Sequence, residues 1–118
     1  MSNTPSFDAL EHQYSMINRN FNTLFADCET ESQRNNLRES IVIARKNFRT
    51  ARYRIFHEND PIVASITTQL IDINAQIEGM IEDYETVVGV LKTISAGVKL
   101  GSSLVVMGSS SSTPSANA

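Results

Sequence analysis

The sequence has little of what disulfide-bonded, metal-binding and β-rich proteins require. Its one cysteine, Cys28, cannot form a disulfide within the chain, and neither of its two histidines lies in an HExxH motif. Five glycines and three prolines are too few for the frequent turns of a β-sandwich or a β-barrel. No charged and then apolar signal sequence precedes residue 30. Together with the single cysteine, this predicts a cytoplasmic protein.

The sequence also lacks a recognisable set of catalytic residues. A di-iron site in a helical bundle uses a glutamate three residues before each histidine, but Ala9 and Arg54 stand at these positions before His12 and His57. Cys28 falls on an apolar stripe, where a cysteine behaves as a small hydrophobic residue more often than as a nucleophile. An acidic stripe without an opposing site is interpreted as a solvated face; it consists of Glu78, Glu82 and Glu85. We therefore predict a protein that is not an enzyme and that has no metal ion, cofactor or small-molecule substrate.

What is present describes one globular helical domain. A chain of 118 residues and 13.1 kDa is long enough for a single modest core. A hydrophobic fraction of 41%, a charged fraction of 19% and a mean hydropathy of −0.19 are typical of a soluble protein. We expect one domain over residues 1–108, followed by a serine-rich tail over 109–118 that has nothing to bury and is disordered.

Apolar residues recur at alternating spacings of three and four, which on an α-helix form a single stripe. The pattern predicts three helices, at about 5–28, 31–58 and 61–100. Capping signals precede them, namely Thr4 before Pro5, Thr30 with Gln33, and Asp60 before Pro61. The stripe of the third helix consists of Ile66, Leu70, Ile73, Ile77, Met80, Tyr84, Val87, Leu91, Ile94 and Val98.

The predicted third helix is too long for its partners. At the rise of an α-helix it measures roughly 60 Å, whereas the first two helices measure about 33 to 40 Å. An antiparallel three-helix bundle, or a set of coiled-coil hairpins, then leaves the segment beyond about Val87 without a partner in the same chain. In the alternative arrangement, Gly97 or Gly101 breaks the helix and the remainder folds back as a short fourth piece.

The overhanging segment has the composition of a helix interface. Gly89, Thr93, Gly97 and Gly101 place a small residue at every fourth position, which allows two helix backbones to approach closely. The predicted surface for self-association or for a protein partner consists of Gly89, Leu91, Thr93, Ile94, Gly97, Val98 and Gly101. An alternative is that Val87–Met107 inserts into a bilayer or lies on it as a peripheral segment, because only two lysines interrupt it.

Charge is distributed unevenly along the chain. The net charge of −3 is the sum of −4 over residues 1–33, +6 over 34–54 and −5 over 55–118. Because acidic segments flank the basic one, we expect them to supply partners for it inside the molecule. The alternative is an anionic partner bound by Arg45, Lys46, Arg49, Arg52 and Arg54.

The sequence thus predicts a non-enzymatic helical module for protein–protein interaction, either a homo-oligomer or a domain that binds another protein. A membrane-active protein is the second hypothesis. Nucleic-acid binding by the basic helix is the third, and it is disfavoured by the pI of about 5.3 and by the lack of a helix-turn-helix pattern.

Overall fold

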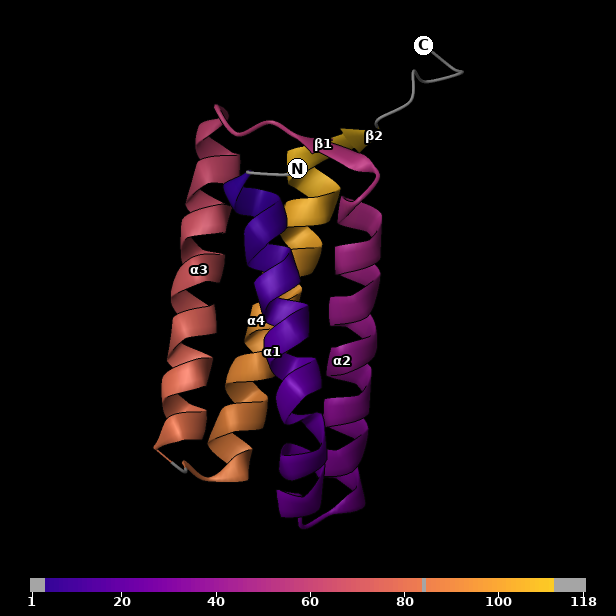
Figure 1. Cartoon of the computed structure of the whole chain (residues 1–118), viewed down its shortest axis with the longest axis vertical. Helices are drawn as coiled ribbons and strands as arrows, with labels where there is room; N and C mark the ends of the chain where they lie inside the picture. The colour runs from indigo at the N-terminus through magenta and orange to yellow at the C-terminus, as the bar shows by residue number, and fades with distance from the viewer. Residues whose placement is uncertain (1–3, 84, 112–118) are drawn as a thin grey trace.

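The structure is a computed structural model that describes residues 4–83 and 85–111, and it is all-α in class (Figure 1). The helices found there are α1 (Pro5–Asp27), α2 (Glu31–Ala51), α3 (Pro61–Glu82) and α4 (Val87–Gly108). Two short strands, β1 (Arg54–Phe56) and β2 (Ser109–Ser111), pair as an antiparallel ladder at one end of the bundle. The expectation of three helices is therefore replaced by four helices of nearly equal length.

The three predicted helix starts are confirmed. The hydroxyl of Thr4 accepts a hydrogen bond from the backbone N–H of Phe7, and α1 begins with Pro5. Thr30 and Gln33 form a capping box at the start of α2. At the start of α3, the Asp60 carboxylate accepts a hydrogen bond from the backbone N–H of Ile62 over 2.8 Å. Each cap satisfies a backbone donor that the first turn leaves without a partner.

The predicted helix over 61–100 is wrong, because α3 ends at Glu82 and α4 begins at Val87. Neither Gly97 nor Gly101 breaks a helix, since both lie within α4. The backbone N–H of Glu85 donates to the Met80 carbonyl over 2.9 Å, which closes the turn. Residues expected to overhang the bundle therefore fold back along it.

The predicted end of the second helix at residue 58 is also wrong. Helix α2 stops at Ala51, and the connection to α3 contains β1, whose Phe56 is buried against the end of the bundle. Phe56 pairs with Ser109, so the first three residues of the expected disordered tail lie in strand β2. The rest of that tail, residues 112–118, lies outside the described residues.

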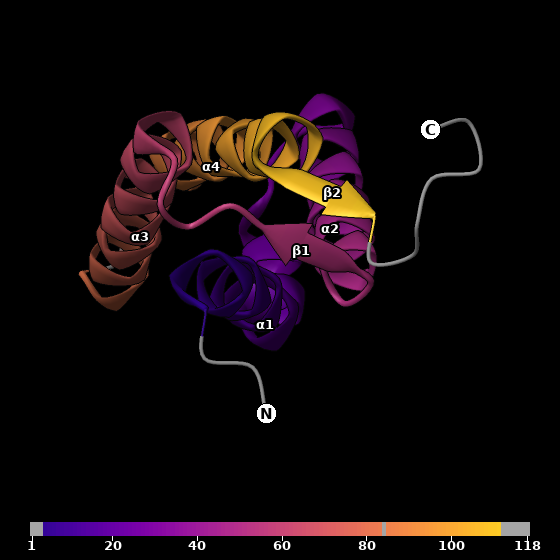
Figure 2. The same ribbon diagram turned by 90° about the horizontal axis from the view of Figure 1, so that it is seen from above.

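Seen from above, the helices form a square (Figure 2). Helices α1 and α2 form one antiparallel hairpin and α3 and α4 form another (Figure 1). Helix α2 packs beside α4, which runs in the same direction, and α1 packs beside α3. Helices α2 and α3 lie diagonally opposite each other, so their connection crosses the top of the bundle.

A polar layer divides the core into two apolar clusters. Met16, Ile77 and Ile94 belong to the cluster nearer the α3–α4 turn, and Leu10 and Leu104 belong to the cluster nearer the β ladder. The buried residues between the clusters are Gln13 from α1, Asn47 from α2 and Asn74 from α3, with Gly101 of α4 at the same level.

Hydrogen bonds within this layer connect different helices. Gln13 Nε2 donates to Asn74 Oδ1 over 3.5 Å, and Asn74 Nδ2 donates to the Ala9 carbonyl over 3.0 Å. Asn47 Nδ2 contacts the Val98 carbonyl and the Ser102 hydroxyl. Because a register shift would leave these buried groups without partners, the layer favours a single alignment of the four helices.

Candidate functional site

The small-residue stripe of α4 lies inside the bundle. A Cβ atom at Gly97 would lie 3.0 Å from Gln13 Nε2, and one at Gly101 would lie 3.0 Å from Gln13 Oε1. The missing side chains therefore allow α1 to approach α4 within one chain. The buried members of the predicted interaction surface are Leu91, Ile94, Gly97, Val98 and Gly101.

The other two members of that surface are half-buried. Gly89 faces Met80 of α3, and the Thr93 hydroxyl donates to the Gly89 carbonyl over 3.0 Å. The expectation of an exposed, unpartnered stripe on this segment is thus corrected. The apolar side of α4 covers its own chain, because the turn after α3 returns it to the bundle.

The cationic side chains gather on one half of the bundle. Helix α2 carries five cationic and two acidic residues, and α4 carries Lys92 and Lys99 and no acidic residue, which gives the pair a net charge of +5. Helices α1 and α3 together carry six acidic residues and one arginine, a net charge of −5. Because α2 packs beside α4 and α1 beside α3, the two halves face in opposite directions (Figure 2).

Among the described residues, the flanking acidic segments supply ion-pair partners only to the start of the basic one. Glu31 pairs with Arg34 and Arg38 of its own helix, at 2.9 and 3.2 Å, and these bonds hold the pKa of its carboxyl below the ordinary range. Arg45 lies over the Tyr14 ring and Arg52 over the Phe48 ring. Within residues 4–83 and 85–111, ion pairs are absent from all five predicted anion-binding residues, Arg45, Lys46, Arg49, Arg52 and Arg54.

Two shallow grooves follow the seam between α2 and α4. The lower groove, of about 490 Å³, contains Lys92 and Lys99, and the upper groove, of about 360 Å³, contains Lys46 and Arg54. No carboxylate lines either groove among the described residues. We call this surface the α2/α4 face. The two lysines of α4 were not predicted to belong to this face, although their spacing of seven residues places them on one side of a helix.

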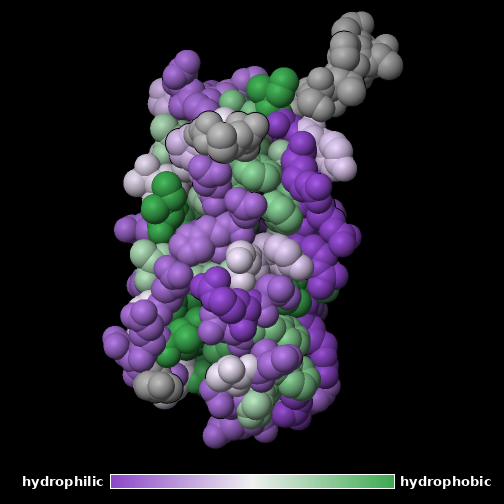
Figure 3. Space-filling view, in the orientation of Figure 1, coloured by the Kyte–Doolittle hydropathy of each residue, from purple (hydrophilic) through white to green (hydrophobic). Residues whose placement is uncertain are grey.

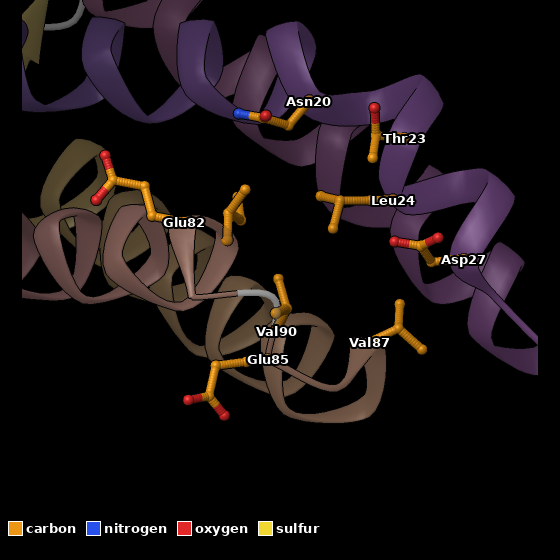
Figure 4. A pocket seen from close by; sticks show the side chains of 9 residues that line it. Asn20, Thr23, Leu24, Asp27, Glu82, Glu85, Val87 and Val90 are labelled. Atoms are coloured by element: carbon orange, nitrogen blue, oxygen red, sulfur yellow. The ribbon is translucent and has the colours of Figure 1, made fainter.

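A third cavity, of about 390 Å³, lies between the lower ends of α1 and α3 (Figure 4). Apolar side chains including Leu24 and Val90 form its floor, and the hydropathy surface shows a green hollow there (Figure 3). Asp27 stands on the α1 wall, whereas Glu82 and Glu85 point in different directions on the opposite wall (Figure 4). Because its three carboxylates do not converge, the cavity does not have the geometry of paired acid and base groups.

The nucleophilic and metal-ligating residues do not form a reactive site in the described part of the chain. Cys28 is buried, its thiol donates to the Leu24 carbonyl over 3.3 Å, and burial raises its pKa. A neutral thiol is a poor nucleophile. His12 contacts Glu78 at 3.2 Å on the exposed surface between α1 and α3. No group of three histidine, cysteine, aspartate or glutamate residues is placed to hold a metal ion within the described ranges.

Helix α4 has the length and composition of a membrane-spanning helix, with 22 residues and a mean hydropathy of 1.4 over its most apolar window. The core helix of a soluble protein meets the same criteria, and 44% of that window is buried inside the bundle. The length and composition of α4 therefore fit both a membrane-spanning helix and the core helix of a soluble protein.

Comparisons with known proteins give no relative for this chain: no protein-family model, no curated protein and no solved structure matches it.

Proposed function

We propose that this chain is a non-enzymatic interaction module that binds an anionic macromolecular partner on its α2/α4 face. The observation that carries the proposal is the pair of grooves along the α2/α4 seam, each of which is lined by two cationic side chains and, among residues 4–83 and 85–111, by no carboxylate. A partner laid along this seam would meet cations from both grooves. The proposed interaction surface therefore includes the exposed side of α4, whereas the sequence had predicted the apolar stripe of the same helix.

The segregation of charge gives the module a preferred orientation toward its partner. The whole chain has a net charge of −3, so a uniform distribution would repel an anionic surface. Opposite charges on opposite halves instead produce a field that turns the α2/α4 face toward the partner during encounter.

Retention on immobilised heparin at low salt tests the proposal, because an anionic protein is retained only by a local cationic surface. We expect the wild type to be retained and the double variant Lys46→Gln/Lys99→Gln to elute at lower salt. The control is Asn18→Asp/Asn22→Asp, which changes the net charge by the same amount on exposed positions of α1. Equal elution of the two double variants contradicts the proposal.

A second candidate function is self-association, and the equal and opposite charges of the two halves favour it. The acidic α1/α3 half of a second copy is complementary to the α2/α4 face. Such a contact joins different surfaces of the two copies, so it builds rings or open chains rather than a symmetric dimer. Sedimentation at low and high salt tests it: a mass that does not fall as salt rises contradicts the contact.

A further inference from the structure

Exposed aliphatic side chains lie at the end of the bundle that carries the upper groove, one of them in the groove itself. Val106 is 78% exposed, Met107 is 63% exposed and Ile55 of β1 is 54% exposed. Val106 lines the upper groove together with Lys46 and Arg54, and Ile55 follows Arg54 in the strand that pairs with β2 directly after α4. Isolated exposed aliphatic residues are common on protein surfaces, but a group of them among unpaired cations is a feature of interaction sites.

The chemistry of this end distinguishes among anionic partners. Single-stranded nucleic acids bind to exposed aromatic rings on which bases stack, and Tyr53 is the only aromatic among the exposed large hydrophobic residues of the described chain. Aliphatic side chains beside lysine and arginine instead match a lipid surface, where the cations meet phosphate groups and the aliphatic groups enter between them.

Resting on the function proposed above, we propose that the upper end of the α2/α4 face docks on the surface of an anionic lipid bilayer. Lys46 and Arg54 meet the headgroups, and Val106 and the neighbouring Met107 enter the interface.

The bundle stays closed in this arrangement, so α4 does not cross the membrane. Ile94 and Leu104 of α4 are fully buried against the other helices. Removing α4 would also deprive Asn47 of its contacts with the Val98 carbonyl and with Ser102. Peripheral docking leaves these contacts intact, whereas insertion of α4 breaks them.

Sedimentation with vesicles of phosphatidylcholine, with and without about 30% phosphatidylserine, measures the binding. We expect binding only with phosphatidylserine. We also expect Lys46→Gln/Arg54→Gln to weaken it about 25-fold, at roughly fivefold for each cation near the surface. Val106→Asn/Met107→Gln should weaken it about tenfold. The matched control is Ile62→Asn/Ile71→Asn, which changes two exposed aliphatic residues of α3 and should leave binding unchanged.

The absence of tryptophan from the chain allows a direct measurement of which side enters the lipid. Val106→Trp should show a blue shift of its fluorescence on phosphatidylserine vesicles, and Ile71→Trp should not. The buried thiol of Cys28 reports whether the bundle opens. Its rate of reaction with a thiol reagent should be the same with and without vesicles.

The remaining outcomes separate the two proposals. Binding that does not require phosphatidylserine, a blue shift at Ile71→Trp, or exposure of Cys28 on vesicles overturns docking by a closed bundle. If heparin retains the protein but vesicles do not bind it, the lipid assignment is overturned and the proposed function is retained. The same holds if a short RNA binds and vesicles do not. A protein retained by neither heparin nor vesicles overturns both.

Discussion

Alanine at Gly101 tests the packing of α4 against the polar layer. A Cβ atom there would lie 3.0 Å from Gln13 Oε1, 3.1 Å from Asn47 Nδ2 and 3.1 Å from Leu10 Cδ2. All three neighbours are buried, and the two amides are held by hydrogen bonds to other helices. The buried neighbours therefore cannot shift easily to make room for the new methyl group.

The matched control is Gly79→Ala in α3, where nothing lies within 4 Å of the added Cβ atom. Alanine improves helix propensity at both positions by up to about 1 kcal/mol, so this gain cancels in the comparison. Overpacking in a core costs about 1–3 kcal/mol. We expect Gly79→Ala to stabilise the protein by about 0.5–1 kcal/mol and Gly101→Ala to destabilise it by about 1–2 kcal/mol.

Thermal unfolding followed by circular dichroism measures both effects. At about 4 °C per kcal/mol for a domain of this size, the two variants should differ in Tm by roughly 6–12 °C. A Gly101→Ala variant as stable as Gly79→Ala would refute the inference that Gly101 lies against Gln13 and Asn47 in the core.

The following three outcomes are also expected. Truncation after Thr86 should remove most of the helical circular dichroism, because α4 contributes residues to both apolar clusters. A shortened chain that keeps the helicity of three folded helices contradicts the four-helix core. Asp60→Ala should lower the free energy of unfolding by about 1 kcal/mol because it removes the cap of α3, whereas Asp60→Asn should keep most of that stability. Unfolding in urea measures both variants, and equal losses of stability contradict the capping role. Burial raises the pKa of Cys28, so its folded thiol should react with a thiol reagent far more slowly than the unfolded one. Stability should then fall as pH rises above the ordinary thiol pKa, because the unfolded thiol ionises first; a stability that rises there contradicts the shift.

Local sequence determined most of the helix starts and part of the core. Caps at Thr4, Thr30 and Asp60 involve residues within three positions of one another, so the sequence shows both members of each hydrogen bond. Leu37 and Ile77 are buried as their stripes predict. The sequence also determines the net charge of each segment, which is negative over residues 1–33 and 55–118 and positive over 34–54.

The end of α3 was not predicted, because the apolar stripe continues from Ile77 through Val98 without a glycine or proline at residues 82–87. The stripe has the same spacing whether its second half continues forward or folds back, since either helix needs one apolar side. A weaker signal was present in the acids at this position. Glu82 and Asp83 are unfavourable at the C-terminus of α3, whereas Glu85 just before α4 is favourable at a helix N-terminus.

The location of the candidate site was decided by the tertiary structure alone. Sequence assigned the small residues of α4 to a contact between chains, but Gly97 and Gly101 contact Gln13 of the same chain. Sequence also placed Lys92 and Lys99 far from the basic segment, from which they are separated by some forty residues. Only the return of α4 beside α2 brings the four cations of the two grooves onto one face. The physical reason is that helix periodicity specifies which side of each helix is buried, whereas the choice of neighbour depends on how all four apolar sides are covered together.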